Sequence, residues 1–511
     1  MRHNNSRWLI ASGVALALGV TTSTQAATVT VNPSTVYQTM DGFGASDNWN
    51  GPFTNAQLGT FFNKDTGIGL SILRMGINSS GGNGSNGGSW ATAKYAAGQG
   101  AKLWGAPWTP PANLKSGNST VGNKGGYLQP ANYDTWATTL ANFATATKTN
   151  TGVDLYAISA QNEPDYSAQV TYDGCVYSDA QMAAFCAVLG PKLHALTPPV
   201  KLIAPESFQW ASLNGFVTAI KGNATANSTV DIFATHDYGG TAVAVANAGR
   251  PIWETEVSSF ETADLSITNG LKVAGWIHDA LVNGPVSAWH YWWLTASDNE
   301  GLLVGSNPAK RMYVEGQYAK FIRPGFVRIS ATEKPASGVT LTAFQSPASV
   351  SPRQIVVVGV NSGSGAAALD FALTGVSVDS VVPWITDANQ SLKKQTKVAG
   401  TTTGFSGSLG GNSVTTFVAY LKSTSLERTA AAAARVEKVQ LLHTPSGAML
   451  TVGASEQPGE VRLLDLEGRE VASRSILSGY TEIPLPGLKS GAYAVVVKRG
   501  DVSVTRDAIL P

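Results

Sequence analysis

Short apolar segments recur along the first two thirds of the chain, and helix-length segments separate them. Segments that are apolar throughout are typical of strands buried on both faces, and helices between them indicate parallel βαβ units. The eight candidate strands are Met40–Ala45, Leu70–Ile77, Ala101–Trp108, Leu155–Pro164, Val200–Ser207, Val230–Tyr238, Pro251–Ser259 and Val286–Leu294. Amphipathic stretches such as Tyr133–Asn150 and Ser178–Leu196 lie between them. This pattern predicts an α/β fold, a (β/α)8 TIM barrel over residues 38–325.

The pattern changes after the barrel. Residues 326–421 alternate strands with turn residues, as in "QIVVVGVNSGSG" and "SVTTFVAYL", which predicts an attached antiparallel β-sandwich. Residues 28–37 would add a strand to this side domain. An Ala-rich linker follows at 422–437, and 438–511 is predicted to be a small C-terminal β domain.

The N-terminus has the three parts of a secretory signal peptide. Arg2 and Arg7 precede an uncharged apolar stretch, Trp8–Val20, and small residues follow up to Ala26 and Ala27. Residues 1–26 are therefore predicted to be removed on export, which implies a secreted protein at or outside the cell surface. The apolar core is too short for a membrane span, and no later run of 18 apolar residues follows.

The charge balance argues against two classes of partner. A net charge of +1, with only 14% charged residues, disfavours capture of nucleic acid or of an acidic membrane. Abundant Gly with 13 Trp and 15 Tyr suits a secreted protein that meets neutral polar substrates, or simply a β-rich extracellular protein. A monomer is expected.

The two cysteines, Cys175 and Cys186, are eleven residues apart. In an exported chain a disulfide is favoured over a metal pair, because no His or further Cys lies near enough to complete a zinc set. We therefore predict a disulfide and no metal site.

Polar and aromatic residues repeatedly end the predicted barrel strands, at the rim where barrel enzymes carry their sites. They are Arg74, Trp108, Asn162, Glu163, Glu206, His236, Tyr238, Glu256, Trp292 and Trp293. Any one of them could instead satisfy a loop or cap a helix. As a set, in a chain with few charges, they predict a functional site.

Two carboxylates stand out within this set. Glu163 ends the fourth predicted strand and Glu256 the seventh, and these strands face each other across the mouth of an eight-stranded barrel. Carboxylates about 5–5.5 Å apart are the arrangement of a retaining glycosidase, in which one is the nucleophile and the other the acid and then the base. Their roles require environments that separate their pKa values.

The other rim residues are predicted to bind substrate. Trp108, Tyr238, Trp292 and Trp293 would stack on sugar rings, and Trp49 is counted with them. Asn162 could hydrogen-bond a sugar hydroxyl. Arg74 is expected to orient the nucleophile, and His236 either lines the site or is a hydrogen-bonded rim residue.

Seven motifs, in order, resemble glycoside hydrolase family 30 of the retaining clan A, and its bacterial xylanase branch most closely. They are "DGFGAS", "SILRMGI", "APWTPPANLK", "YAISAQNEPDY", "LIAPESFQW", "WETEVSS" and "YAKFIRPGFVRISAT". The resemblance covers about residues 28–421. It implies a retaining endo-β-1,4-xylanase with Glu163 as general acid/base and Glu256 as nucleophile, with no cofactor, and it treats Glu206 as structural.

Glu254 competes with Glu256 on sequence grounds. Strand alternation would place both side chains on one face, so it does not decide between them. The Thr-Glu of the resembling motif favours Glu256.

One loop departs from the glucuronoxylanases of this branch, which the resemblance implies carry an arginine that pairs with the glucuronate of the substrate. Here "YWWLTASDNEGLLVGSNPAKRMY" has no Arg or Lys between Trp293 and Lys310, but has Asp298 and Glu300. A carboxylate side group needs a cationic partner. The loop therefore favours an endo-xylanase without strict dependence on glucuronate.

Other functions stay open at this point. They are a glucuronoxylan-specific endo-xylanase, a β-1,6-galactanase or β-1,6-glucanase of the same family, and a non-catalytic carbohydrate-binding protein. The tail, with "LLDLEGREV" and "LPGLKSGAYAVVVKRG", resembles a type IX secretion sorting domain, so the secretion machinery is a candidate partner besides the polysaccharide; a plain β-sandwich spacer is the alternative.

Overall fold

The computed structural model describes residues 26–84, 89–422, 439–444, 447–452, 459–465, 468–476, 481–499 and 502–510. The predicted signal peptide and the predicted linker lie outside the described residues except for Ala26 and Lys422 at their borders. Among the described residues, no helix combines the length and the apolar character needed to cross a membrane.

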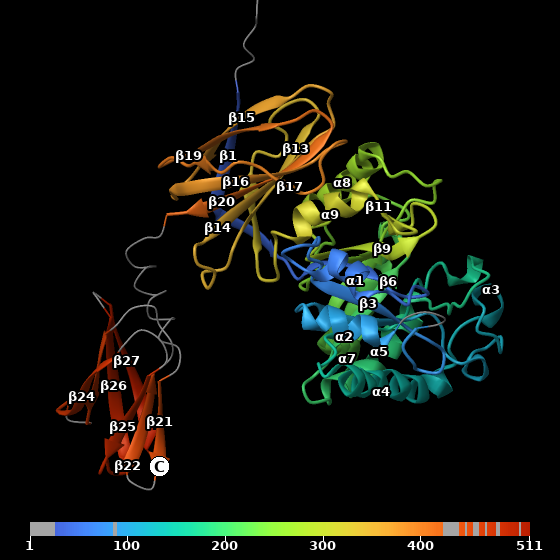
Figure 1. The fold of residues 1–511 in the computed structure, drawn as a ribbon. Helices are drawn as coiled ribbons and strands as arrows, with labels where there is room; N and C mark the ends of the chain where they lie inside the picture. Colours follow the sequence, from blue (N-terminus) through green and yellow to red (C-terminus); the bar gives the residue numbers. More distant parts are fainter. Residues whose placement is uncertain are drawn as a thin grey trace, which may run out of the picture.

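Eight parallel strands close into a barrel, because each pairs with the next and the last pairs with both its predecessor and the first. They are β2 (Gly42–Ser46), β3 (Ile72–Ile77), β4 (Lys102–Pro107), β5 (Ala157–Ser159), β6 (Lys201–Ser207), β7 (Val230–His236), β8 (Ile252–Glu256) and β9 (Ala288–Ala296). Two short strands, β10 (Gly301–Val304) and β11 (Asn307–Pro308), extend the sheet beyond β9. The predicted TIM barrel is confirmed (Figure 1).

The helices pack around the outside of the barrel, except the short α3, which lies in the loop between β4 and α4. They are α1 (Asn55–Phe62), α2 (Trp90–Gly98), α3 (Gly122–Gly125), α4 (Tyr133–Thr151), α5 (Asp179–His194), α6 (Trp210–Gly222), α7 (Ala224–Thr229), α8 (Ile267–Val282) and α9 (Lys310–Ala319). Their ends follow from local sequence: Ser178 and Gln181 form a capping box at the start of α5, and α4 ends at Gly152 in a left-handed conformation. The connection between β7 and β8, residues 237–251, contains no helix.

The apolar side chains inside the barrel form a cluster of their own, distinct from the layer between the strands and the helices. This cluster contains Ile72, Ile203 and Ile232. It also contains Trp104 and Trp253, which are in edge contact with their ring centroids 6.1 Å apart. Successive strand residues alternate between this cluster and the outer layer, as expected for a pleated strand. The interior is thus filled with side chains, and the strand ends are free to form a site.

The side domain is a ten-stranded sheet that folds back on itself. Its strands are β1 (Ala27–Thr39), β12 (Val327–Ala331), β13 (Val339–Gln345), β14 (Gln354–Asn361), β15 (Ala367–Leu373), β16 (Val378–Thr386), β17 (Lys393–Lys394), β18 (Val398–Ala399), β19 (Gly404–Leu409) and β20 (Ser413–Leu421). Rings from β15, β19 and β20 meet in its core, with Phe371 and Phe405 stacked at 4.4 Å and Phe417 at 5.2 Å from Phe371. The pairing is antiparallel except between β1 and β15, which run parallel.

The C-terminal unit consists of two small antiparallel sheets. One contains β21 (Val439–Thr444), β22 (Gly447–Val452) and β25 (Thr481–Pro486). The other contains β23 (Gly459–Leu464), β24 (Glu470–Ile476), β26 (Gly491–Arg499) and β27 (Val502–Leu510). Buried residues of both sheets, such as Leu450 and Val495, form one core.

The predicted disulfide is wrong, because Cys175 and Cys186 are both free and buried. Cys186 faces the core from α5, with its Sγ 3.8 Å from the Sδ of Met182 one turn earlier. Cys175 lies in the loop before α5, and burial raises its pKa to about 12 although Lys115 nearby opposes this. Each thiol is buried, and neither is bonded to the other.

Candidate active site

Arg74, on β3, is the centre of the polar network at the carboxyl ends of the strands. Its side chain is fully buried; Nη1 donates to Glu256, and Nη2 donates to Glu206 and, over 2.6 Å, to Asn162 Oδ1. Its guanidinium also lies 4.7 Å from the ring centroid of Trp108. A planar guanidinium can bind several acceptors in fixed directions, so Arg74 holds three strand ends in one arrangement.

Glu163 lies beyond the end of its strand rather than on it. The strand predicted over Leu155–Pro164 is limited to Ala157–Ser159, because the chain then turns. Glu163 has a left-handed φ of 45°, and its N–H donates to the carbonyl of Glu206 over 3.0 Å. This turn directs the carboxylate into the mouth, where Oε1 lies 2.9 Å from His236 Nδ1.

A bulge decides which glutamate of β8 enters the mouth. Glu254 pairs with Thr235 and Glu256 with His236, so Thr255 is an extra residue without a counterpart on β7. Glu254 remains in the outer layer, near the indole groups of Trp289 and Trp210, where burial raises its pKa well above the usual range. Glu256 instead accepts a hydrogen bond from Tyr238 over 2.9 Å in addition to that from Arg74.

His236, at the end of β7, lies among three carboxylates. Nδ1 is 2.9 Å from Glu163 Oε1, and Nε2 is 3.4 Å from Glu206 Oε1 and 3.8 Å from Glu256 Oε2. Burial alone would lower its pKa, but the charges of Glu256, Glu163 and Glu206 outweigh burial and raise the pKa to about 10. His236 is therefore a buried imidazolium at neutral pH.

The carboxylates of Glu163 and Glu256 face each other, with one oxygen of each within 4.8 Å of the other and of a His236 ring nitrogen. Burial raises the pKa of Glu256, and the charge of Glu163 adds to this, while His236 and Arg74 act in the opposite direction. The two carboxylates thus have different partners: Glu256 binds Arg74 and Tyr238, and Glu163 binds His236.

Judged by geometry alone, the side chains of Glu163, His236 and Glu256 could also bind a metal ion. Among the described residues, one potential ligand atom from each of these three side chains lies within 4.8 Å of the other two. However, His236 carries a proton at neutral pH, and the guanidinium of Arg74 already contacts Glu256. A cation would have to displace that proton beside an existing positive charge, so the electrostatics disfavour a metal centre.

Aromatic side chains form one wall of the mouth. Trp49 lies 5.1 Å from Trp108 and 6.1 Å from Trp292 between ring centroids, and Trp292 stacks on Trp293 at 4.8 Å. Such indole faces are suited to the apolar faces of sugar rings. The structure therefore brings together every residue that the sequence suggested for substrate binding.

Three further residues border the mouth, and the sequence analysis either did not consider them or gave them another role. Tyr172, in the loop before α5, donates to Glu163 Oε2 over 3.4 Å. Phe260, 70% exposed, lies 5.2 Å from the ring of Tyr238. Glu206 was expected to be structural, yet it contacts Arg74 and His236. Neither Tyr172 nor Phe260 ends a strand, so the strand pattern carried no signal for them.

The loop after β9 is held by a buried arginine. Arg311 donates to the carbonyls of Gly301, Asp264 and Asp298 and to two asparagine side chains. Arg311 is the first arginine after this loop in the sequence, but its N–H groups already donate to other parts of the protein. Glu300 in the loop has a raised pKa, through burial and through the charges of Asp298 and then Glu256. The rim here is acidic.

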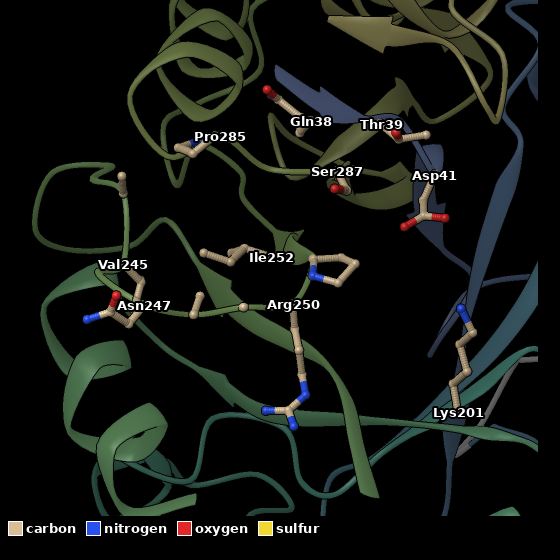
Figure 2. A pocket seen from close by; sticks show the side chains of 14 residues that line it. Gln38, Thr39, Asp41, Lys201, Val245, Asn247, Arg250, Ile252, Pro285 and Ser287 are labelled. Atoms are coloured by element: carbon tan, nitrogen blue, oxygen red, sulfur yellow. The ribbon is translucent and has the colours of Figure 1, made fainter. Parts of the chain in front are cut away.

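A pocket of about 660 Å³ lies at the opposite, amino ends of the barrel strands. Figure 2 shows Asp41, Lys201, Ile252 and Ser287 around it, all near strand starts. Its cations have partners: Lys201 donates to Tyr156 over 3.0 Å, and Arg250 donates to Asn227. This end of a barrel generally contributes to stability rather than chemistry.

Comparisons with known proteins point to one family. A family model described as O-Glycosyl hydrolase family 30 matches residues 83–247. Glucuronoxylanase XynC of Bacillus subtilis (strain 168) is 32% identical over 425 residues, which cover 79% of this chain and 94% of that protein. Two solved structures, a GH30 endoxylanase from Clostridium papyrosolvens C71 and the subfamily 8 xylanase Xyn30A from Clostridium acetobutylicum, each have a TM-score of 0.66. They are 32% and 31% identical, and each match covers 77% of this chain and 99% of the solved one.

The relative from Bacillus subtilis is matched over 94% of its length. On this similarity and on the confirmed barrel, the chain belongs to glycoside hydrolase family 30.

Proposed function

We propose that this chain is a secreted, retaining endo-β-1,4-xylanase that hydrolyses xylan without strict dependence on glucuronate side groups. The observation that carries the proposal is the pair Glu163 and Glu256, whose carboxylate oxygens lie within 4.8 Å. An inverting enzyme needs carboxyl groups about 6.5–9.5 Å apart to admit a water, whereas a retaining enzyme needs about 5–5.5 Å. The short separation supports double displacement.

In the first step Glu256 attacks the anomeric carbon, and the bond from that carbon to the leaving oxygen breaks. Glu163 gives its proton to the leaving oxygen, and a covalent glycosyl-enzyme forms. In the second step Glu163 takes a proton from water, which attacks the same carbon and releases Glu256 as a carboxylate. Acid, base and nucleophile are all supplied by these two side chains, so the reaction requires no cofactor.

The contacts of Glu256 support its role as nucleophile. Arg74 and Tyr238 donate to its two oxygens, and both interactions favour the ionised carboxylate. Glu163, which faces Glu256 across the mouth, contacts His236 and Tyr172, so the two carboxylates have different sets of neighbours. Asn162, tied to Arg74, is placed beside Glu163, from where its amide can bind a hydroxyl of the sugar.

Xylan is the favoured substrate because of the relatives. One is named a glucuronoxylanase, and two solved structures are described as xylanases, each more than 30% identical to this chain. The wall formed by Trp49, Trp108 and Trp292 suits a chain of unsubstituted sugar rings.

Independence from glucuronate rests on the loop after β9. A bound glucuronate needs a cationic partner, but Arg311 is committed to backbone carbonyls and Glu300 lies within electrostatic reach of Glu256. A glucuronoxylan-specific enzyme is the second candidate, favoured by the name of the Bacillus subtilis relative.

Product analysis on wheat arabinoxylan, glucuronoxylan, β-1,6-galactan and β-1,6-glucan tests the proposal. We expect oligosaccharides from both xylans at comparable rates, with retained anomeric configuration in the first product detected by NMR. Cleavage of only the glucuronate-bearing polymer would favour the second candidate. Cleavage of only a β-1,6-glycan would refute xylanase activity, and binding without cleavage would indicate a carbohydrate-binding protein.

Export is part of the proposal and rests on the sequence of the two ends. Residues 1–26 have the pattern of a signal peptide, and 438–511 resemble a sorting domain. N-terminal sequencing of protein recovered from the culture medium should begin near Ala27. Deletion of 438–511 should leave hydrolysis intact and reduce the exported amount if this segment directs sorting.

A further inference from the structure

We propose that Glu206 is a positioning residue of the active site: its carboxylate holds Arg74 and His236 in place against Glu256 and Glu163. This inference rests on the proposed function, in which Glu163 and Glu256 are the acid/base and the nucleophile. Among the described residues, the carboxylate of Glu206 makes no hydrogen bond with either of their carboxylates; it acts through the two cations.

The position of Glu206 is unusual for a merely structural carboxylate. It lies at the end of β6 with no exposed side-chain surface and with a left-handed φ of 63°. A non-glycine residue in this conformation costs of order 1–3 kcal/mol, and such residues cluster at functional sites. Its carbonyl also accepts the N–H of Glu163, itself at a φ of 45°, so the two strained turns are joined.

The contacts of Glu206 explain its influence. Oε1 accepts a hydrogen bond from Arg74 Nη2 and lies 3.4 Å from His236 Nε2. Arg74 continues to Glu256 and His236 continues to Glu163. One oxygen thus anchors both cations, and each cation in turn contacts one member of the catalytic pair.

The charges around the network determine the sign of the expected effect. Three buried carboxylates, Glu163, Glu206 and Glu256, surround the two cations Arg74 and His236, and their charges raise the pKa of His236. Removal of the Glu206 charge should therefore weaken proton binding by His236. Other titratable groups also lie around this cluster. They are Tyr172 from the loop before α5, Tyr238 after β7, Glu254 from the outer face of β8, His290 from β9 and Glu300 from the following loop.

His290 is not the group that titrates in this range. Its Nδ1 lies 2.9 Å from the carbonyl of Glu254, and the indole of Trp104 donates to its Nε2 over 3.3 Å. These contacts require the neutral imidazole, and burial lowers its pKa to about 3. A histidine signal that titrates at high pH can therefore be separated from His290.

The test compares Glu206→Gln and Glu206→Asp with Glu315→Gln. Glu315 is a matched control, because it is fully buried on α9 and burial keeps its pKa well above the usual range, so Gln preserves its neutral state outside the site. Circular dichroism and thermal melting establish that each variant folds. The first readout is the pH dependence of kcat/KM on whichever β-glycan the wild type cleaves; the second is histidine NMR of ¹⁵N-labelled protein, which needs no substrate.

We expect Glu206→Gln to lower kcat/KM by about 10- to 100-fold, mainly through kcat, since small displacements of catalytic groups have effects of this size. The acid limb of its pH profile should move to lower pH, and His236 should titrate about one unit or more below its wild-type value. Glu206→Asp should restore part of the rate and most of the pH profile. Glu315→Gln should match the wild type in both readouts.

An unchanged rate in Glu206→Gln, or a lower rate with His236 titrating as in the wild type, would overturn the proposal and leave Glu206 a structural residue. If the wild type cleaves no polymer of the panel, the proposed function fails, while the titration of His236 still decides the role of Glu206. The two failures are therefore distinguishable.

Discussion

Glu254 and Glu256 are two residues apart on one strand, yet they lie on opposite sides of the barrel wall. The extra residue Thr255 interrupts the alternation, so Glu256 enters the mouth beside Arg74 while Glu254 stays in the outer layer near Trp210. Regular alternation would have placed both on the same face. The bulge therefore leaves one of the two carboxylates available for chemistry.

The first prediction separates these two glutamates. Glu256→Gln should lower kcat by roughly 10³-fold or more, because a nucleophile that is lost cannot form the covalent intermediate. Glu254→Gln should retain most of the activity, because that carboxyl lies outside the mouth, burial favours its neutral form, and Gln matches its shape. Reducing-end release from xylan measures both; equal activity of Glu256→Gln and the wild type would exclude this mechanism.

The second prediction concerns Glu163. Glu163→Gln should reduce hydrolysis of xylan by about 10²- to 10⁴-fold, the usual contribution of general acid catalysis. With an aryl β-xyloside whose leaving group needs no proton, the first step should be much less affected, and a burst of phenol should precede slow turnover. Stopped-flow absorbance detects the burst. An equal loss on both substrates would argue against a role as acid.

The third prediction follows from the raised pKa of Glu256. The ionised carboxylate is the active form, so activity is present above its pKa and is lost as the pH falls through it. The acid limb of kcat/KM should therefore lie above 4.5, the ordinary value for glutamate. Arg74→Lys removes donors that favour the ionised form, and it should move this limb to still higher pH.

The matched control for that variant is Arg250→Lys, at the amino end of the barrel, where Arg250 binds Asn227. Its acid limb should coincide with that of the wild type. If Arg74→Lys also left the limb in place, the interaction between Arg74 and Glu256 would not control the nucleophile.

The fourth prediction concerns side-group preference. Glu300→Gln should raise the ratio of activity on glucuronoxylan to that on arabinoxylan by roughly two- to five-fold, the range expected for one partly exposed charge. The effect should diminish as salt is added. Glu333→Gln, on the side domain, is the control and should leave the ratio unchanged. A ratio that is insensitive to Glu300 would remove the electrostatic argument from the loop.

The fifth prediction concerns the two thiols. Because Cys175 and Cys186 are free, a reducing agent should not change Tm, and thiol titration of unfolded protein should detect both. A disulfide closing this short loop would contribute about 2–3 kcal/mol. A fall in Tm on reduction would show that the pair is bridged after all.

Much of the fold was predictable because it depends on local pattern. Apolar runs separated by amphipathic helices specify buried parallel strands, and a closed barrel brings all their carboxyl ends to one rim. This is why Arg74, His236 and Trp292 could be placed near one another although they are far apart in the chain. The first and last residues of individual strands were less predictable. β5 is much shorter than its apolar run, because the chain turns after it and directs Glu163 into the mouth.

The sequence by itself determined the barrel, the rim residues and the two candidate carboxylates, because hydrophobic periodicity and strand order are properties of the chain. Only the tertiary structure decided that Glu256 rather than Glu254 faces the mouth, that Glu206 supports Arg74 and His236, that Arg311 is committed to carbonyl groups, and that the two cysteines do not pair. Each of these depends on the register between strands or on contacts between residues distant in the chain. A one-residue bulge reverses the direction of a side chain without altering the sequence pattern around it.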